Sequence, residues 1–487
     1  MSLSLQVIKS SGLLLGLQLI HRGLGIVSTL ILARLLTPDH FGVVALVTIA
    51  LQFFELLVET GNQQYIVQKS VLEDEDLNTA WTLDILSKTI IALIVIVASP
   101  LVAEWFQEPD LTIALAVASL ALPIRALKTP GMFRLARQIN YKPLFQLSLW
   151  QKGVSFVTVV TIAVIEPSYW AIIIGNLVAA VVFTVGSYRV EPYRPRWSLL
   201  RLREQWQFSQ WLLLRGIVGF TRSQVDNLLV SKAFGTSQLG GYNLVREISL
   251  LPALSAIIPM SEPLLAAIAN AKNEPMQLAF RVRLSLALMI SALAPLTVFI
   301  MSYPDLIVRV LLGPDWGRFA PLLEPFGLFF FTFCLFALIS DAIIAQGRVK
   351  LLFWFDVVST LAIVVILWRW ATHSLDAMAW WRGWLAIATT GVLLLILQKQ
   401  VRFGLGRLTV LSIPALIGSG AGMISAMAMP VSEAHFLIRF FVLGSTHVLI
   451  SAAVTVALAS LLLKKTEEWG LITSVYYRMS KRIKSEN

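Results

Sequence analysis

The chain has 487 residues, of which 57% are hydrophobic and only 14% are charged, and its formal net charge is +11. Its mean hydropathy of +0.76 is far above that of a soluble domain. Such a chain cannot hide its apolar surface in water, so the composition excludes a large soluble domain and indicates a protein of the bilayer.

Runs of about 17 or more mostly apolar residues predict the membrane-spanning helices. In the first half these runs lie near 12–36, 41–58, 80–104, 111–127, 144–165 and 168–188. In the second half they lie near 206–231, 241–265, 284–301, 321–345, 351–370 and 379–397, and two more follow near 408–430 and 435–463. The first run is followed by no small-residue cleavage site, which indicates a retained helix. The sequence thus predicts an all-α polytopic membrane protein of about 14 transmembrane helices.

Lysine and arginine residues are divided unequally between the two sets of predicted loops. Twenty-five lie on the side that carries both termini and seven on the opposite side. The smaller set comprises Arg34, Lys232, Arg309, Arg318, Arg369, Arg382 and Arg439. The positive-inside rule therefore predicts cytoplasmic termini, and the net positive charge is interpreted as loop charge rather than as a nucleic-acid surface.

Two six-helix halves are predicted on either side of a segment with five arginines and two prolines. A shift of 198 residues aligns 33–42 with 231–240, and each stretch is a helix, a short turn and a second helix. A half with six spans begins and ends on the same side of the membrane, so a second copy of it has the same orientation in the bilayer. The alignment therefore predicts a parallel repeat about a pseudo-two-fold axis. A chance match between two apolar hairpins is the alternative.

The predicted domains follow from this division. They are an N-terminal six-helix bundle (1–188), a basic cytoplasmic linker (189–205), a C-terminal six-helix bundle (206–397), two additional transmembrane helices (398–463) and a basic amphipathic cytoplasmic tail (464–487). Within the thirteenth helix, the glycine-rich stretch 418–422 predicts close helix packing.

Apart from the cations already counted with the loops, seven remain inside the predicted spans: Arg22, Lys88, Arg125, Lys152, Arg215, Arg222 and Arg246. Each costs about 2.5–3.5 kcal/mol at a lipid-facing helix centre, so each needs a partner, a route to the interface or contact with water. Asp84 lies four residues before Lys88, and Asp226 lies four residues after Arg222, so each pair can neutralise itself on one helix face. Arg125 lies at a helix end, where snorkelling explains it.

Four of these cations have no carboxylate three or four residues away: Arg22, Lys152, Arg215 and Arg246. Because Arg22 and Arg215 occupy the first and seventh helices, which are equivalent in the repeat, they predict a central cavity with a cation from each half. A guanidinium stays protonated and binds phosphate through paired donors, which suits an anionic substrate. The alternative is pairing across helices with Glu55, Glu59, Glu247, Glu262, Asp341 or Asp356.

The candidate site residues therefore form two groups. The predicted substrate-binding cations are Arg22, Arg215, Arg222, Lys152, Arg246 and Lys88. The candidates for ion coupling or for polar lining of the cavity are His21, Asp84, Asp226 and Glu247. No motif of a nucleotide-binding loop, a zinc protease or a nucleophile elbow is present in the sequence, which argues against an enzyme. No catalytic residue, metal ligand or cofactor is predicted.

Two short stretches carry a resemblance to a known family. They are Leu32-Ala33-Arg34-Leu35-Leu36-Thr37-Pro38-Asp39-His40-Phe41-Gly42, and Asp226-Asn227-Leu228-Leu229-Val230 followed by Leu239-Gly240-Gly241-Tyr242-Asn243-Leu244. With the helix count, they make the chain similar to a Wzx-type polysaccharide flippase of the multidrug/oligosaccharidyl-lipid/polysaccharide (MOP) exporter superfamily.

The resemblance implies a flippase of the bacterial inner membrane that works by alternating access. It implies transport of an undecaprenyl-diphosphate-linked oligosaccharide from the cytoplasmic to the outer face, with a cationic cavity holding the diphosphate and the glycan. The implied partners are this substrate, membrane lipids and polysaccharide-assembly proteins. The alternatives are a cation-coupled multidrug exporter of the same superfamily and a membrane glycan polymerase, although the longest predicted outer stretch, 301–321, is short for the latter.

Overall fold

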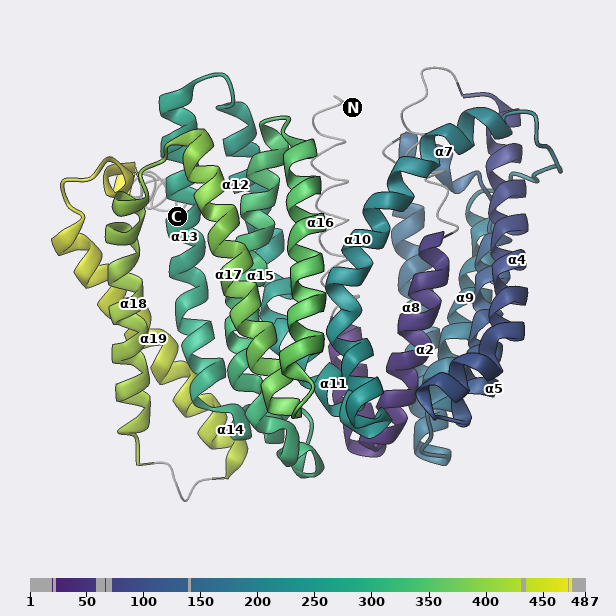
Figure 1. Cartoon of the computed structure of the whole chain (residues 1–487), viewed down its shortest axis with the longest axis horizontal. Coiled ribbons are helices and arrows are strands. Elements are labelled where there is room, and N and C mark those ends of the chain that lie inside the picture. The colour runs from purple at the N-terminus through teal and green to yellow at the C-terminus, as the bar shows by residue number, and fades with distance from the viewer. Residues whose placement is uncertain are drawn as a thin grey trace, which may run out of the picture. The chain divides into compact units, whose positions relative to one another are not determined.

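The computed structural model describes residues 20, 23–57, 66, 72–138, 142–430, 435–471 and 473–474, without the side chains of 136, 203–215, 262 and 266. All regular secondary structure in these ranges is helical. The chain forms two compact units, Met1–Leu244 and Val245–Asn487, and the boundary between them falls within one helix. In each unit the long helices run roughly side by side (Figure 1).

The N-terminal unit begins with a described helical stretch, Gly23–Leu35. Its labelled helices are α2 (Pro38–Leu57), α4 (Asp74–Phe106), α5 (Asp110–Ser119), α6 (Ala121–Ala126), α7 (Met132–Arg137), α8 (Lys142–Ile165), α9 (Trp170–Val190), α10 (Leu202–Phe234) and α11 (Thr236–Pro252), the last of which continues past the unit boundary. The core of this unit includes a contact of Leu32 and Leu36 with Val159 of α8.

The C-terminal unit continues from α11 through a short π-helix, η1 (Ala253–Ile257). It comprises α12 (Ile258–Asn270), α13 (Pro275–Ser302), α14 (Pro304–Leu311), the 3-10 helix η2 (Pro314–Leu322), α15 (Leu323–Ala345), α16 (Val349–Ile366), the π-helix η3 (Leu367–Ala371), α17 (Leu375–Val401), α18 (Leu405–Met427) and α19 (Phe436–Leu462). The predicted outer stretch 301–321 is folded as α14 and η2 and buries Trp316 and Phe319.

Eleven helices in the described part of the chain are long and apolar enough to cross a membrane. Each coincides with one of the predicted runs, so the prediction of a multi-pass helical membrane protein is confirmed. The other three predicted runs differ. The run 111–127 is divided into α5 and α6, the run 206–231 lies in the more polar α10, and the run 12–36 is described only in part.

Helix α4 is long because its two ends have different chemistry. It has 33 residues and starts with Asp74, Glu75 and Asp76 in its first turn, where carboxylates interact favourably with the helix dipole. The backbone N–H of Glu73 donates to Asp76 Oδ2 at 3.0 Å, which satisfies a group that the first turn leaves without a helical partner. The polar first turns therefore extend the helix beyond its apolar section.

Helices α2 and α11 cross at two glycines. A Cβ atom on Gly42 would collide with the carbonyl oxygen of Thr236, and a Cβ atom on Gly240 would collide with the carbonyl oxygen of Pro38. In the alignment with a shift of 198 residues, Pro38 corresponds to Thr236 and Gly42 corresponds to Gly240, so each contact is the counterpart of the other. The same two positions of the aligned stretches therefore face one another across the crossing, as they do at a contact on a two-fold axis.

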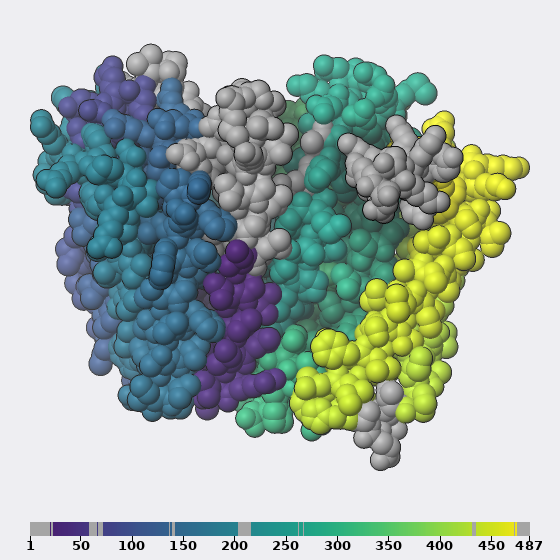
Figure 2. Space-filling model, turned by 180° about the vertical axis from the view of Figure 1, so that it is seen from behind, coloured from purple at the N-terminus to yellow at the C-terminus, as the bar shows by residue number. Residues whose placement is uncertain are grey.

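The last two helices of the C-terminal unit, α18 and α19, pack against each other, and α19 lies in the yellow region of Figure 2. Added Cβ atoms on Gly418 and Gly422 of α18 would collide with Thr455 and Ser451 of α19. The prediction that this glycine-rich stretch mediates close helix packing is confirmed.

Substitution of either crossing glycine by alanine should destabilise the protein. Gly42→Ala and Gly240→Ala each place a methyl group against backbone atoms that cannot rotate away, so we expect a similar loss of about 1–3 kcal/mol for each. Thermal unfolding of the purified protein in detergent measures this loss. Gly391→Ala in α17, which meets no described atom within 4 Å, is the matched control. A midpoint for Gly42→Ala equal to that of the control would contradict the close crossing.

Candidate functional site

Five charged side chains gather in the N-terminal unit, and we call them the charge cluster. Glu55 lies on α2, Asp84 and Lys88 lie on α4, Arg125 lies on α6, and Lys128 follows α6. Lys88 Nζ lies 2.9 Å from Asp84 Oδ1, and Arg125 Nη1 lies 3.3 Å from Glu55 Oε1. The charges of all four act on the Lys128 ammonium. Three cations therefore share a small region with two carboxylates, which leaves a surplus of positive charge.

The sequence specifies only part of this cluster. The pair of Asp84 and Lys88 was predicted from their spacing on one helix face and is confirmed. Arg125 was interpreted as a snorkelling residue, but the structure pairs it with Glu55, which is 70 positions away. The spacing of three residues between Arg125 and Lys128 is the signal that could have indicated a shared basic face.

A cavity of about 170 Å³ adjoins the cluster. Glu55 and Arg125 line it together with Gln52 of α2 and Asn176 of α9. Its remaining lining residues are mostly apolar. An arginine, a carboxylate and two amides provide donors and acceptors suited to hydroxyl and phosphate groups.

Amide side chains continue from this cavity toward the start of α11. Gln224 Nε2 donates to Gln52 Oε1 at 3.2 Å, and Asn227 Nδ2 donates both to Gln224 Oε1 at 2.9 Å and to Asn243 Oδ1 at 3.1 Å. These bonds connect α2, α10 and α11 within the N-terminal unit. Such a network of donors and acceptors fixes helix positions and presents groups that can bind polar ligands.

Asp226 lies beside this network but is fully buried. Its carboxylate accepts a hydrogen bond from the Tyr242 hydroxyl at 3.1 Å. The predicted pairing of Asp226 with Arg222 stays a prediction.

Burial lowers the pKa of Lys128, which follows α6 outside the helices that could span the membrane. Desolvation is the main cause, because it disfavours the charged ammonium. The neighbouring cations Lys88 and Arg125 lower the pKa further, whereas Asp84 and Glu55 raise it. Lys128 thus titrates at a lower pH than a solvent-exposed lysine.

A second group of cations lies in the C-terminal unit around the ring of Phe329 on α15. The guanidinium carbon of Arg246 on α11 lies 5.7 Å from the ring centre, and that of Arg382 on α17 lies 4.5 Å from it. Arg382 was assigned to a loop on the opposite side, but it lies two turns inside α17 and is only 4% exposed. An aromatic ring can stabilise such cations through its negative face.

The remaining predicted site residues are dispersed or lie outside the described part. Lys152 on α8 and Arg222 on α10 are half-buried, whereas Glu247 on α11 is exposed. His21 and Arg22 lie outside the described residues, and so does the side chain of Arg215. The predicted convergence of Arg22 and Arg215 therefore stays a prediction.

The described residues include no group of three or more His, Cys, Asp and Glu side chains that could hold a metal ion. The charge cluster instead provides positive charge, hydrogen-bond donors and an adjoining cavity. This arrangement can hold and release an anionic polar group, because phosphate binding needs positive charge and directed donors rather than a nucleophile.

Residues 31–321 match the family described as "Polysaccharide biosynthesis protein". The chain belongs to this family. It is also 22% identical over 351 residues to the lipopolysaccharide biosynthesis protein WzxC of Escherichia coli, covering 69% of this chain and 70% of that protein. The succinoglycan biosynthesis transport protein ExoT of Rhizobium meliloti is 23% identical over 420 residues, covering 78% and 83%. The resemblance to the Wzx-type proteins of polysaccharide biosynthesis is thereby confirmed.

Comparison with solved structures identifies the fold of this chain. The inward closed conformation of the lipid II flippase MurJ superposes with a TM-score of 0.73 at 14% identity, covering 91% of this chain and 99% of that one. An inward-facing multidrug resistance MATE transporter of the MOP superfamily superposes with a TM-score of 0.64 at 13% identity, covering 78% and 94%. The fold is therefore that of the MurJ and MATE transporters.

The pair of Lys88 and Asp84 should behave as one unit in a double-mutant cycle. Asp84→Asn leaves the partly buried Lys88 ammonium without its partner, and Lys88→Met leaves the carboxylate without its own. Each single variant should therefore unfold at a lower temperature, while the double variant should recover part of the loss through a coupling of about 0.5–3 kcal/mol. Strict additivity of the two single effects would show that the ion pair contributes nothing.

Proposed function

We propose that this protein flips a lipid-linked oligosaccharide, held by its diphosphate, from one face of the membrane to the other. The surplus of cations in the charge cluster is the observation that carries the proposal, because a net positive site inside a membrane protein selects an anion. Membership of a polysaccharide biosynthesis family and likeness to proteins named as transport proteins and as a lipid II flippase support the same reaction. These relatives are transporters rather than enzymes.

The physical task of such a flippase is to move a hydrophilic headgroup through hydrocarbon. A diphosphate loses its hydration when it leaves the headgroup layer, and charge-assisted hydrogen bonds from arginine and lysine replace the lost water. Amide side chains such as those of Gln52, Gln224 and Asn227 can do the same for sugar hydroxyls. Alternating access then exposes the loaded site to each side in turn.

The proposed architecture has fourteen transmembrane helices in two six-helix halves plus two further helices. The halves span 1–188 and 206–397, the linker spans 189–205, the extra helices span 398–463 and the tail spans 464–487. The reciprocal contacts of Gly42 and Gly240 support a repeat with a pseudo-two-fold axis, because they join equivalent positions of the two aligned stretches. A parallel repeat lets two similar halves surround one substrate site.

The proposed location is the bacterial inner membrane with both termini in the cytoplasm. The excess of lysine and arginine in the loops on the terminal side supports this orientation. With cytoplasmic termini, the C-terminal ends of α2 and α6 lie on the cytoplasmic side. Glu55 is close to the C-terminal end of α2 and Lys128 follows α6, so the charge cluster lies nearer the cytoplasm. Substrate made in the cytoplasm would then meet the cluster on entry.

The proposed substrate-binding cations extend the predicted set. They are Arg22, Lys88, Lys152, Arg215, Arg222 and Arg246, to which the described contacts add Arg125, Lys128 and Arg382. Asp84, Asp226, Glu247 and His21 are proposed to hold these cations or to couple transport to an ion. The substrate and the membrane lipids are the proposed partners, together with polysaccharide-assembly proteins.

Loss of one cation from either group should reduce flipping. Arg125→Gln and Arg246→Gln each remove a charge-assisted contact of about 1.5–3 kcal/mol, so substrate affinity should fall roughly tenfold to hundredfold. Purified protein in liposomes, with a labelled diphosphate-linked oligosaccharide and a probe that reaches only one leaflet, measures the flux. Arg22→Ala and Arg215→Ala test the predicted residues in the same assay.

The matched control for these substitutions is Arg348→Gln, which removes an exposed arginine in the loop before α16. Its flux should equal that of the parent protein. If Arg125→Gln and Arg246→Gln also retain full flux at equal protein levels, the cationic sites do not hold the substrate. If the parent protein itself moves no labelled lipid, the proposed function fails.

The lowered pKa of Lys128 predicts a pH dependence. Because this pKa lies below the ordinary lysine value of 10.5, raising the pH from neutrality should remove the positive charge of Lys128 before that of exposed lysines. Flux should therefore decline on the alkaline side. Lys128→Arg keeps its charge, so it should shift this decline to higher pH. Identical pH profiles for the two proteins would assign the decline to another group.

A cation-coupled multidrug exporter is the second candidate, favoured by the TM-score of 0.64 to a MATE transporter and by the intramembrane carboxylates Asp84 and Asp226. The two functions differ in the charge of the cargo. An exporter of cationic drugs needs an acidic cavity, whereas the charge cluster has more cations than carboxylates. Drug efflux from cells without any change in surface glycan would favour the exporter.

A further inference from the structure

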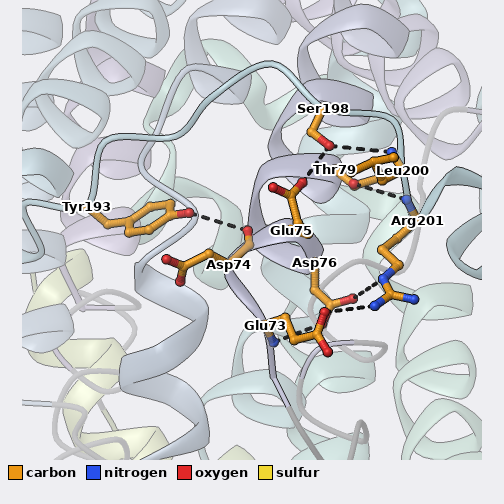
Figure 3. Close-up of polar contacts among 9 residues, drawn as sticks. All are labelled: Glu73, Asp74, Glu75, Asp76, Thr79, Tyr193, Ser198, Leu200 and Arg201. Carbon is orange, nitrogen blue, oxygen red and sulfur yellow. Dashed lines mark hydrogen bonds and ion pairs between the residues drawn. The ribbon is translucent and has the colours of Figure 1, made fainter.

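The connection between α9 and α10 is bound along the side of α4. We call residues 193–201 the strap. Five of its contacts reach the first turns of α4, more than 100 positions earlier in the chain. Figure 3 shows two of them, from Ser198 to Glu75 and from Arg201 to Thr79. The sequence predicted a hydrophilic linker here, but the strap is an extended segment with a fixed place on the N-terminal unit.

The inward face of the strap uses both backbone and side-chain groups. The backbone N–H of Arg196 donates to Asn78 Oδ1 at 2.9 Å, and that of Ser198 donates to Thr82 Oγ1 at 3.1 Å. The Ser198 hydroxyl donates to Glu75 Oε2 at 2.7 Å. These partners lie three and four residues apart on α4, so they form a single stripe along the helix.

Two ionic contacts flank this stripe. At the end of the strap, Arg201 Nη2 lies 2.7 Å from Glu73 Oε2, and Arg201 Nε lies 4.0 Å from Asp76 Oδ1. At its start, the Tyr193 ring lies 4.6 Å below the guanidinium of Arg134, which also pairs with Asp74. The acidic start of α4 therefore neutralises the cations that face it and fixes which face of the strap turns outward.

The outward face combines apolar and basic side chains. Trp197 is 64% exposed and Leu200 is 78% exposed, and Leu199 between them is also exposed. The side chains of Arg194 and Arg196 are exposed as well, and neither forms an ion pair within the described part of the chain. An extended, exposed Trp and Leu surface next to two arginines is unfavourable in water but suits a membrane interface.

The length of α4 places this face at headgroup depth. With 33 residues the helix is about 50 Å long, which exceeds a hydrocarbon core of about 30 Å by roughly 20 Å. The excess lies in the polar first turns, to which the strap is bound. The ring of Trp197 lies 5.2 Å from that of Trp81, near the start of the apolar section of the helix. Trp197 therefore lies close to the boundary where tryptophan is enriched.

We propose that the outward face of the strap is a binding surface for anionic phospholipid headgroups. Trp197 and Leu200 insert among the upper acyl and glycerol groups, while Arg194 and Arg196 contact lipid phosphates. The hydrogen bonds to α4 fix the backbone that carries these four side chains, so lipid binding requires little further ordering of the chain. Lipid binding at this surface does not require the transported substrate. The lipid composition around the protein would influence how the strap is held.

The test uses the full-length protein in nanodiscs with a single reporter cysteine. Leu200→Cys in a Cys334→Ala background carries a fluorophore, and spin-labelled lipids with phosphatidylglycerol or phosphatidylcholine headgroups act as quenchers. We expect strong lipid quenching at position 200, with the anionic quencher several-fold more effective than the neutral one. Asn273→Cys, in the exposed turn between α12 and α13, is the control and should show little quenching by either lipid.

Substitution of the two arginines distinguishes the effect of their charge from the contact of position 200 with lipid. Arg194→Gln with Arg196→Gln should remove most of the several-fold preference for the anionic quencher while leaving quenching by the neutral lipid unchanged. Lipid quenching at position 200 no stronger than at position 273 would overturn the membrane contact. Equal quenching by the two lipids in the parent protein would overturn the anionic preference. Neither result depends on whether the protein transports a sugar lipid.

Discussion

The cost of a charge in hydrocarbon is the constraint on which the rest of this structure depends. Each cation at a lipid-facing helix centre costs about 2.5–3.5 kcal/mol, so a helix that contains one must turn it toward a partner or toward water. Asp84 satisfies Lys88 on its own helix, whereas Glu55 joins Arg125 across two helices. The helices of the N-terminal unit are therefore arranged by their charged residues as well as by apolar packing.

Helix positions could be predicted from the sequence because apolar length is a local property. The pair of Asp84 and Lys88 was predictable for the same reason. The pair of Glu55 and Arg125 was not, because it joins residues far apart in the chain, and a basic residue at a helix end has snorkelling as an equally good explanation. Arg382 lies close to the start of the predicted run 379–397 and was counted with the preceding loop, whereas α17 begins at Leu375 and places this arginine two turns inside the helix.

The strap shows a second limit of local sequence patterns. Its arginines and prolines indicated a polar linker, which is correct for composition. They gave no sign that Asn78, Thr79 and Thr82 would accept its backbone N–H groups. Thr82 lay within the run 80–104, which was interpreted only as a transmembrane helix, and Asn78 and Thr79 lay just before that run. The polar residues in the first turns of a helix longer than the bilayer are the signal that such a docking site leaves in a sequence.

The mixture of signs in the charge cluster matters for a flippase, because the protein must release what it binds. A site of three unopposed cations would hold a diphosphate tightly and would repel itself when empty. In the proposed flippase, Glu55 and Asp84 would reduce both effects. Each pairs with one cation of the cluster and would compete with the substrate phosphates for it. The remaining excess positive charge then selects an anion without making its departure slow, as multi-step transport requires.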